Sequence, residues 1–153
     1  MAIDVEEERS PGEDTRRLID EGLDTYNAEK AGPDNAEKAG PDNAEDLWII
    51  ARDDDRNPCG GVKARTFYSW MFIDWLWVSP SARGCGIGVR LLAKAERVAQ
   101  DRGCTGAYVD TFSFQAPDFY RQSGYQEFGR IDGLPPGHAC IWLKKTFAVP
   151  QKF

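Results

Sequence analysis

The sequence predicts an α/β fold organised around a β–α–β unit, and three consecutive segments predict that unit. Residues 70–78 form an aromatic and β-branched run that stops before Pro80, which is typical of a buried strand. Positions 91–99 carry apolar residues at helical spacing, with charged residues on the opposite face. Residues 107–112 are mostly apolar and predict a strand that returns beside the first one.

The segments before this unit predict a strand, a helix and a hairpin. Residues 2–8 are a candidate short strand, which ends before Pro11 and Gly12. Residues 47–52 predict a strand that ends in the polar turn at 53–58, and residues 60–68 pair back with it. Between them, Asp14 or Thr15 can cap a helix whose apolar residues recur at helical spacing, namely Leu18, Ile19, Leu23 and Tyr26.

Two more strands are predicted near the C-terminal end. Residues 125–131 predict the first, and a loop rich in glycine and proline follows at 133–137. Residues 138–147 contain an apolar and aromatic run that predicts the last strand.

Residues 28–43 consist of the octapeptide AEKAGPDN, repeated once in tandem. Gly-Pro-Asp-Asn favours a turn and interrupts any helix that Ala-Glu-Lys begins. Two copies are too few for a solenoid. We therefore interpret 28–43 as a surface loop lengthened by duplication, because the entropy of loop closure grows slowly with length.

The composition predicts a single domain over residues 1–153, located in the cytoplasm. The chain has 25 acidic and 19 basic residues, and this net charge of −6 argues against a nucleic-acid partner and favours a cationic amine. No apolar run is long enough to span a bilayer, and no signal-peptide pattern is present, so we expect no membrane partner. Four scattered cysteines and a single histidine argue against a metal site and for reduced thiols.

A glycine-rich turn, Arg83-Gly84-Cys85-Gly86-Ile87-Gly88, joins the predicted strand at 70–78 to the following helix. A helix start exposes unpaired N–H groups and the positive end of the macrodipole, and glycines let an anion approach the backbone. Arg83 adds a forked cation, so the turn predicts a phosphate or pyrophosphate site. Val89 and Arg90 follow the last glycine, which excludes a P-loop, and the glycine spacing differs from the dinucleotide-binding fingerprint.

Two motifs resemble the GNAT superfamily of N-acetyltransferases. The spacing Arg83-x-x-Gly86-x-Gly88 resembles the acyl-CoA pyrophosphate loop of that family, and Phe119-Tyr120-x-x-x-Gly124-Tyr125 resembles the signature of its short helix. Loop, helix, strand and short helix follow the order of the family from Trp70 to about Phe128. The resemblance implies a mixed, mostly antiparallel sheet with the parallel β–α–β unit at its centre and helices on both faces.

The resemblance also implies acetyl-CoA as the cosubstrate, bound mainly through the backbone and without a metal. The N–H groups of residues 85–88 would hold the pyrophosphate, and the strand at 70–78 would pair with pantetheine. The N–H of Val78 would stabilise the oxyanion of acyl transfer. The expected cofactor-binding residues are Trp77, Val78, Arg83, Gly84, Cys85, Gly86, Ile87 and Gly88.

Tyr120 and Asp74 are the candidate catalytic residues. Tyr120 matches the family tyrosine that protonates the leaving thiolate, a step that suits a phenol with a pKa of about 10. Simple alternation along the strand places Asp74 on one face with Phe72, Leu76 and Val78, where desolvation would raise its pKa toward that of a base. Both also have structural interpretations, which are packing for Tyr120 and pairing with a backbone group or an arginine for Asp74.

Asp110 and His138 are the candidate acceptor-binding residues. Asp110 stands at the end of the strand at 107–112, and the carboxyl ends of parallel strands face the ligand crevice, so it competes with Asp74 as the base. His138 begins the last strand, near the place where the acceptor pocket of the family often opens. The structural alternatives are a loop cap for Asp110 and a solvated loop histidine for His138.

These features predict an enzyme that transfers an acetyl group from acetyl-CoA to a primary amine of a small molecule by direct attack in a ternary complex. Two alternatives stay open: acetylation of a protein N-terminus or lysine, and a non-catalytic acyl-CoA-binding sensor. GNAT proteins are often dimers, which makes a homodimer a candidate assembly. The loop at 28–43 would then be a candidate lid over the acceptor site.

Overall fold

The computed structural model describes residues 2–32 and 44–148, which belong to two compact units divided after Asn43. The first unit contains the predicted helix, α1 (Glu13–Ala31). No side chain caps this helix, so the predicted cap at Asp14 or Thr15 is wrong. Asp14 lies inside the first turn instead, where the helix dipole stabilises its charge. Gly32, with a φ of 87°, ends the helix.

Residues 2–8 form no strand, contrary to the prediction. Ile3 and Val5 are 74% and 94% exposed, and three glutamates follow them in the sequence. A segment with so little apolar surface has no face to bury against a neighbouring strand. The first four residues of the tandem repeat belong to α1, and most of the remaining predicted loop lies outside the described residues.

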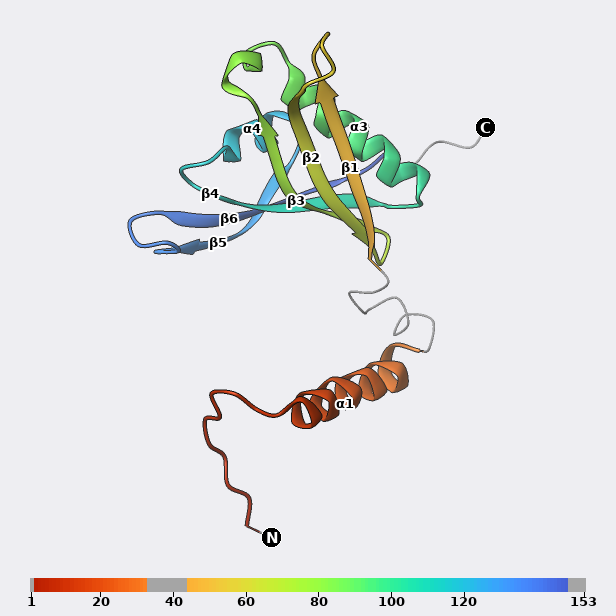
Figure 1. The fold of residues 1–153 in the computed structure, drawn as a ribbon, viewed down its shortest axis with the longest axis vertical. Helices are drawn as coiled ribbons and strands as arrows, with labels where there is room; N and C mark the ends of the chain where they lie inside the picture. The colour runs from red at the N-terminus through yellow and green to blue at the C-terminus, as the bar shows by residue number, and fades with distance from the viewer. Residues whose placement is uncertain (1, 33–43, 149–153) are drawn as a thin grey trace. The chain divides into compact units, whose positions relative to one another are not determined.

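The second unit is built on a six-stranded mixed sheet with the strand order β1-β2-β3-β4-β6-β5 (Figure 1). β3 and β4 are parallel, and the other neighbouring strands are antiparallel. The six strands predicted between residues 47 and 147 are confirmed, together with the parallel pair. They are β1 (Glu45–Arg52), β2 (Pro58–Phe67), β3 (Trp70–Val78), β4 (Gly106–Phe112), β5 (Gln126–Asp132) and β6 (Ala139–Thr146).

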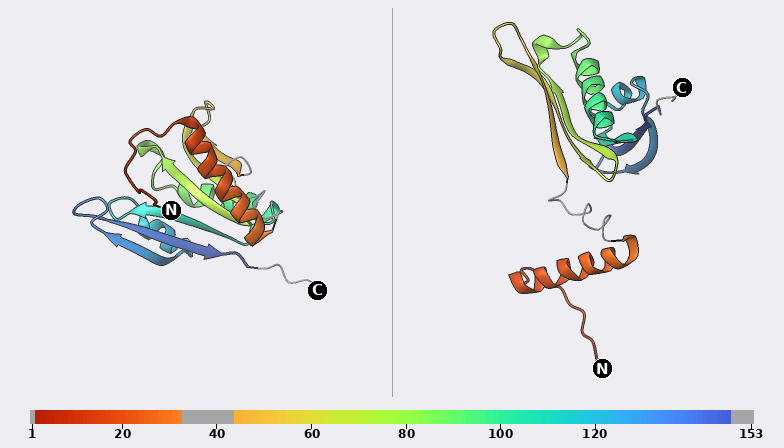
Figure 2. Two further views of the ribbon diagram at one scale, coloured as in Figure 1. Left: turned by 90° about the horizontal axis from the view of Figure 1, so that it is seen from below. Right: turned by 90° about the vertical axis from the view of Figure 1, so that its right-hand side faces the viewer.

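Two helices and one short turn complete this unit. The turn η2 (Pro80–Ala82) and helix α3 (Ile87–Asp101) connect β3 to β4, and the short helix α4 (Pro117–Gln122) connects β4 to β5. α3 and α4 lie against the same face of the sheet (Figure 2). The buried residues of α3 recur at the predicted helical spacing: Leu91, Leu92, Ala95 and Ala99.

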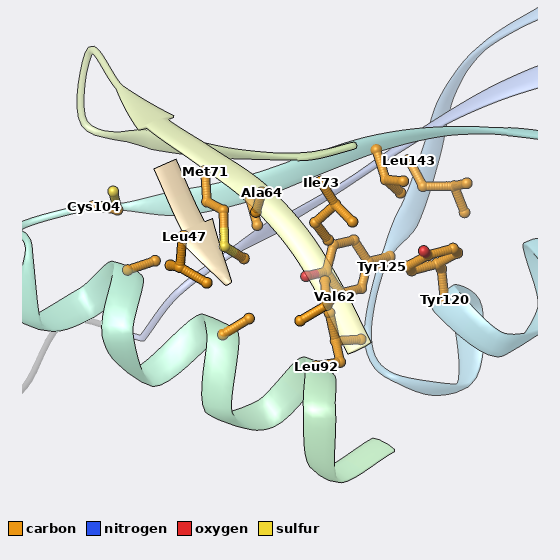
Figure 3. Close-up of a cluster of buried hydrophobic side chains, with 14 of the residues drawn as sticks. Leu47, Val62, Ala64, Met71, Ile73, Leu92, Cys104, Tyr120, Tyr125 and Leu143 are labelled. Atoms are coloured by element: carbon orange, nitrogen blue, oxygen red, sulfur yellow. The ribbon is translucent and has the colours of Figure 1, made fainter. Parts of the chain in front are cut away.

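The core lies between α3 and this face of the sheet (Figure 3). Met71 and Ile73 of β3, Leu92 of α3 and Leu143 of β6 are among its largest fully buried side chains. Each contributes about 1.5–3 kcal/mol of transfer free energy relative to an exposed side chain. The core therefore fixes β3 against α3, and with them the turn that connects the two.

β3 contains a β-bulge at Asp74. The register against β2 passes from Ile73 to Trp75, which leaves Asp74 as one extra residue. Ile73 before the bulge and Leu76 after it both pack into the core. The prediction that Asp74 shares a face with Leu76 and Val78 is therefore wrong, because one inserted residue reverses the side of every residue that follows.

Candidate active site

β3 and β4 separate halfway along their length (Figure 1). They pair over Trp70–Ile73 and Gly106–Val109, and beyond these residues each strand pairs only with its other neighbour. We call the diverging halves, Asp74–Val78 and Asp110–Phe112, the β3–β4 fork. Backbone groups along its inner edges have no strand partner, so an extended ligand can form hydrogen bonds with them.

The N–H group of Val78 points into the fork. The N–H of the next residue, Ser79, donates to the Cys59 carbonyl of β2 at 2.8 Å. Successive residues of a strand direct their backbone groups to opposite edges, so those of Val78 face away from β2. The Nε of Arg83 donates to the Val78 carbonyl at 3.0 Å and thereby ties the turn to the end of β3. The N–H of Val78 can therefore donate to a charge that develops in the fork.

The glycine-rich turn forms a hollow of about 220 Å³ together with Phe119 of α4. Gly84 and Gly86 have φ angles of 82° and 76°, which glycine adopts without strain. Gly86 is the N-cap of α3 and no side chain caps this helix, so the N–H groups of its first turn are open to an anion. A Cβ on Gly88 would lie 3.2 Å from the Phe119 ring, which explains a glycine there.

The structure thus brings the predicted cofactor-binding residues into one continuous stretch. It runs from the end of β3 at Trp77 and Val78, through the turn at 83–86, to the first residues of α3 at Ile87 and Gly88. Cys85 is an exposed free thiol whose sulfur contacts the carbonyl of Arg83 at 3.9 Å. The backbone geometry fits a pyrophosphate, and the open edge of β3 fits the amide-bearing pantetheine arm of acetyl-CoA.

Tyr120 is 6% exposed on α4, with its ring edge-on against Phe119 and Tyr125 (Figure 3). Burial, and then the nearby charge of Asp110, raise its pKa to about 12. Its hydroxyl makes no hydrogen bond within the described part of the chain. Among those residues, every fully buried side-chain oxygen has a hydrogen-bond partner. The Tyr120 hydroxyl has none, so its oxygen is in contact with solvent-accessible space. It is therefore free to donate to a ligand.

Asp74 is not the desolvated carboxylate that alternation predicts. Its Oδ2 accepts hydrogen bonds from Lys63 Nζ at 2.8 Å and Arg65 Nε at 3.2 Å, and its Oδ1 lies 3.2 Å from a terminal nitrogen of Arg65. The same contact raises the pKa of the Lys63 ammonium. The predicted apolar environment is wrong because the bulge turns Leu76 and Val78 to the core face, whereas Asp74 stays on the face where β2 carries these cations. Pairing with an arginine, the structural interpretation of Asp74, is what its geometry supports.

Asp110 begins the free half of β4. It is exposed and forms no salt bridge with any residue that the structure describes. Its charge contributes to the raised pKa values of Tyr120 and Tyr108. Of the two rival carboxylates, Asp110 is the one with free oxygens.

His138 lies at the start of β6 and is exposed. Its ring lies edge-on to Phe114, with 4.8 Å between the ring centroids, and Phe114 stacks on Phe112 at 5.4 Å. Within the described residues no contact joins His138 to Asp110 or Tyr120. The sequence analysis missed Phe114, because a single aromatic residue in a short loop forms no periodic pattern.

A polar network behind α4 was also missed. The Tyr125 hydroxyl donates to Glu96 of α3 at 3.0 Å, and Lys145 of β6 donates to Glu96 at 2.7 Å and to the Ser123 carbonyl at 3.0 Å. Burial, followed by the charge of Glu96, raises the pKa of Tyr125 far above its ordinary value. The network connects α3, β6 and the end of α4, so it fixes the ring against which Tyr120 packs.

A central parallel pair that diverges beside a glycine-rich turn, with a tyrosine-bearing helix next to it, is the arrangement expected of an acyl-CoA-dependent acetyltransferase. The chain belongs to the acetyltransferase (GNAT) family, whose model matches residues 13–125. It is 39% identical to Acetyltransferase Atu2258 of Agrobacterium fabrum over 102 residues, which cover 67% of this chain and 74% of that protein. It is 44% identical to the Blasticidin-S acetyltransferase of Streptomyces morookaense over 87 residues, which cover 56% of this chain and 64% of that protein.

Solved structures agree with this assignment. The structure of an acetyltransferase from Bacillus cereus superposes with a TM-score of 0.78 at 29% identity, covering 93% of this chain and 98% of that one. An aminoglycoside 6′-N-acetyltransferase complexed with coenzyme A shares the fold, with a TM-score of 0.63 at 18% identity and coverage of 93% and 98%. The chain is therefore an acetyltransferase of this family. Over residues 2–32 and 44–148, no helix has the length and apolarity needed to cross a membrane.

Proposed function

We propose that this enzyme transfers an acetyl group from acetyl-CoA to a primary amine of a small cationic molecule, by direct attack within a ternary complex. The observation that carries the proposal is the β3–β4 fork. It has an uncapped helix start and glycine-rich turn at one end, and the free hydroxyl of Tyr120 and the unpaired carboxylate of Asp110 beside it. The Blasticidin-S acetyltransferase relative supports a small-molecule acceptor.

Bound acetyl-CoA would supply an acetyl group activated as a thioester. The N–H groups of residues 85–88 would hold its pyrophosphate, with the terminal nitrogens of Arg83 beside them. The open edge of β3 at Trp77 and Val78 would pair with the pantetheine amides. The N–H of Val78 would donate to the acyl oxygen as negative charge develops on it.

Two side chains would move protons. A primary amine resembling lysine has a pKa of about 10.4, so at neutral pH nearly all of it is protonated and cannot attack. Asp110 would bind the ammonium group and accept its proton, directly or through water. Tyr120 would donate its hydroxyl proton to the departing sulfur. Asp74 is the weaker candidate for the base, because Lys63 and Arg65 already occupy both of its oxygens.

Direct measurement of CoA release with a panel of amines tests the proposal. We expect release with small cationic amines, and none of comparable rate with peptides bearing a free N-terminus or lysine. Asp110→Asn should lower kcat/KM by roughly 10²-fold or more, whereas Asp74→Asn should retain most of the activity per folded molecule. Acetyl-CoA binding without release for any acceptor would identify a sensor instead. A larger loss in Asp74→Asn than in Asp110→Asn would transfer the role of base to Asp74.

A further inference from the structure

We infer that the acceptor is an organic cation with a flat ring, namely an aromatic or heteroaromatic ring that carries a protonated aminoalkyl group. The ring would stack on Phe114 while the ammonium group meets Asp110. This inference rests on the proposed function and narrows its substrate class. It is carried by a row of aromatic side chains on β4, on β6 and on the loops at their ends, beginning at Asp110, a carboxylate with which no described cation pairs.

The row follows from the sheet register. Asp110 and Phe112 share one face of β4, the face opposite the core, because they are two residues apart. Trp142 of β6 is the direct partner of Asp110 in the antiparallel ladder. Phe114 stacks nearly parallel on Phe112, with 12° between the ring planes, and His138 meets Phe114 edge-on at 74°. We call Phe112, Phe114, His138 and Trp142 the aromatic ladder.

The Phe114 end of the aromatic ladder is accessible to a ligand. Phe112 covers one face of the Phe114 ring, and His138 meets it edge-on. The Phe114 side chain is nevertheless 54% exposed. An exposed phenylalanine side chain is unfavourably hydrated. An aromatic ligand that stacks on it would remove this apolar surface from water.

The loop that carries Phe114 is fixed before any ligand arrives. The N–H of Ser113 donates to the Ala139 carbonyl at 2.8 Å, and the Ala139 N–H donates to the Ser113 hydroxyl at 2.9 Å. The Gln115 side-chain oxygen accepts from the Phe112 N–H at 3.0 Å. The first two bonds hold the loop against the start of β6, and the third ties it to the end of β4. Little ordering entropy is therefore lost when a ligand stacks on the ladder.

The charge at the ladder favours a cation. Asp110 has no cationic partner among the described residues. Lys144 of β6, on the same face of the sheet, lies 5.4 Å from the ring of Phe128 instead. A carboxylate beside several aromatic faces attracts organic cations through Coulomb and cation–π interactions together. A saturated ring of equal size would keep the Coulomb attraction and lose most of the stacking.

Paired amines separate these two contributions. Benzylamine and cyclohexylmethylamine have similar size, and both are protonated at pH 7. We would titrate each into enzyme saturated with CoA, which lacks an acetyl group to transfer, and measure Kd by ligand-detected NMR. We expect benzylamine to bind about 2- to 12-fold more tightly to the wild type, the range of one aromatic stacking contact.

Phe114→Leu should bring the ratio of the two Kd values close to one, whereas Phe128→Leu, the same change at an exposed phenylalanine on β5, should leave the ratio unchanged. Asp110→Asn should weaken both amines by a similar factor. Equal Kd values in the wild type, or a preference that survives in Phe114→Leu, would overturn the inference. CoA release from acetyl-CoA with equal kcat/KM for both amines would overturn it too, while leaving the proposed function intact. No release with any amine would overturn the proposed function itself.

Discussion

Replacing Tyr120 by phenylalanine removes the hydroxyl group, with its proton, and little else. The ring keeps its edge-on contacts with Phe119 and Tyr125, and the missing hydroxyl leaves no described residue without a partner. We therefore expect the free energy of unfolding to change by less than about 0.5 kcal/mol. Any large kinetic effect of this variant then reports on chemistry and not on folding.

The raised pKa of Tyr120 sets the size of that effect. Its value of about 12 exceeds the pKa of a free thiol, about 8.5, so transfer of the proton to a solvated thiolate would cost about 5 kcal/mol. The burial that raises the pKa of the tyrosine also raises that of a thiolate in the same space, which reduces this cost. General acids accelerate reactions by roughly 10²- to 10⁴-fold. Because the pKa of Tyr120 exceeds that of the thiol, we expect kcat to fall by roughly 10²-fold, the lower end of this range.

The assay measures kcat and the KM for acetyl-CoA between about pH 6 and pH 10. An acid with a raised pKa stays protonated throughout this range, so wild-type kcat should show no alkaline decline from Tyr120. The variant should be slower at every pH, with an unchanged KM for acetyl-CoA. Wild-type kcat in Tyr120→Phe would reduce Tyr120 to a packing residue. A wild-type kcat that falls above about pH 9, with no such fall in the variant, would show that the pKa of the acid is not raised.

Three further changes test other parts of the structure. Gly106→Ala should lower the free energy of unfolding by about 1–3 kcal/mol in urea titrations, because a Cβ there would overlap the Trp70 indole and lie 2.7 Å from the Lys145 carbonyl oxygen of β6. Wild-type stability would contradict this packing. Gly86→Val should weaken CoA binding at least about tenfold in calorimetry, since a φ of 76° strains a β-branched residue. Unchanged affinity in a folded variant would contradict an anion site at this turn. Asp74→Asn should cost about 1–3 kcal/mol of stability, because it removes the one described anion of Arg65 and one of the two described anions of Lys63. A neutral effect would show that solvent and Asp46 compensate the two cations.

Periodicity and turn chemistry were sufficient to predict most of the second unit. The strand at Trp70–Val78, the uncapped turn and the buried positions of α3 follow from alternation, glycine placement and helical spacing, all of which are local. The prediction failed for residues 2–8, where two apolar residues beside a run of glutamates were interpreted as a strand. A strand forms only where its apolar side chains find a partner surface to pack against, and the alternation of residues within the segment does not show whether such a surface exists.

The site was harder to predict than the fold, because its critical contacts join distant segments. The pairing of Asp74 with Lys63 and Arg65 joins residues of two strands, and no pattern within either strand reveals it. The Glu96 network joins residues 29 and 49 positions apart, and the stacking of Phe114 next to His138 depends on the return of β6. The family motif indicated Tyr120 and the end of the strand indicated Asp110 as candidates, but the burial of the first and the free oxygens of the second are properties of the folded chain.

The single extra residue at Asp74 also constrains how this sheet could change length. β3 stops pairing with β4 at Ile73, immediately before the bulge, and bulges increase the local bend and twist of a strand. Deleting Asp74 would restore strict alternation from Ile73 to Leu76 without moving either from the core. The straightened strand could then continue alongside β4, satisfying backbone groups that are now left open. Such a shortened protein would gain a more regular ladder and lose the β3–β4 fork, so regular strand pairing and an open fork favour opposite lengths at this position.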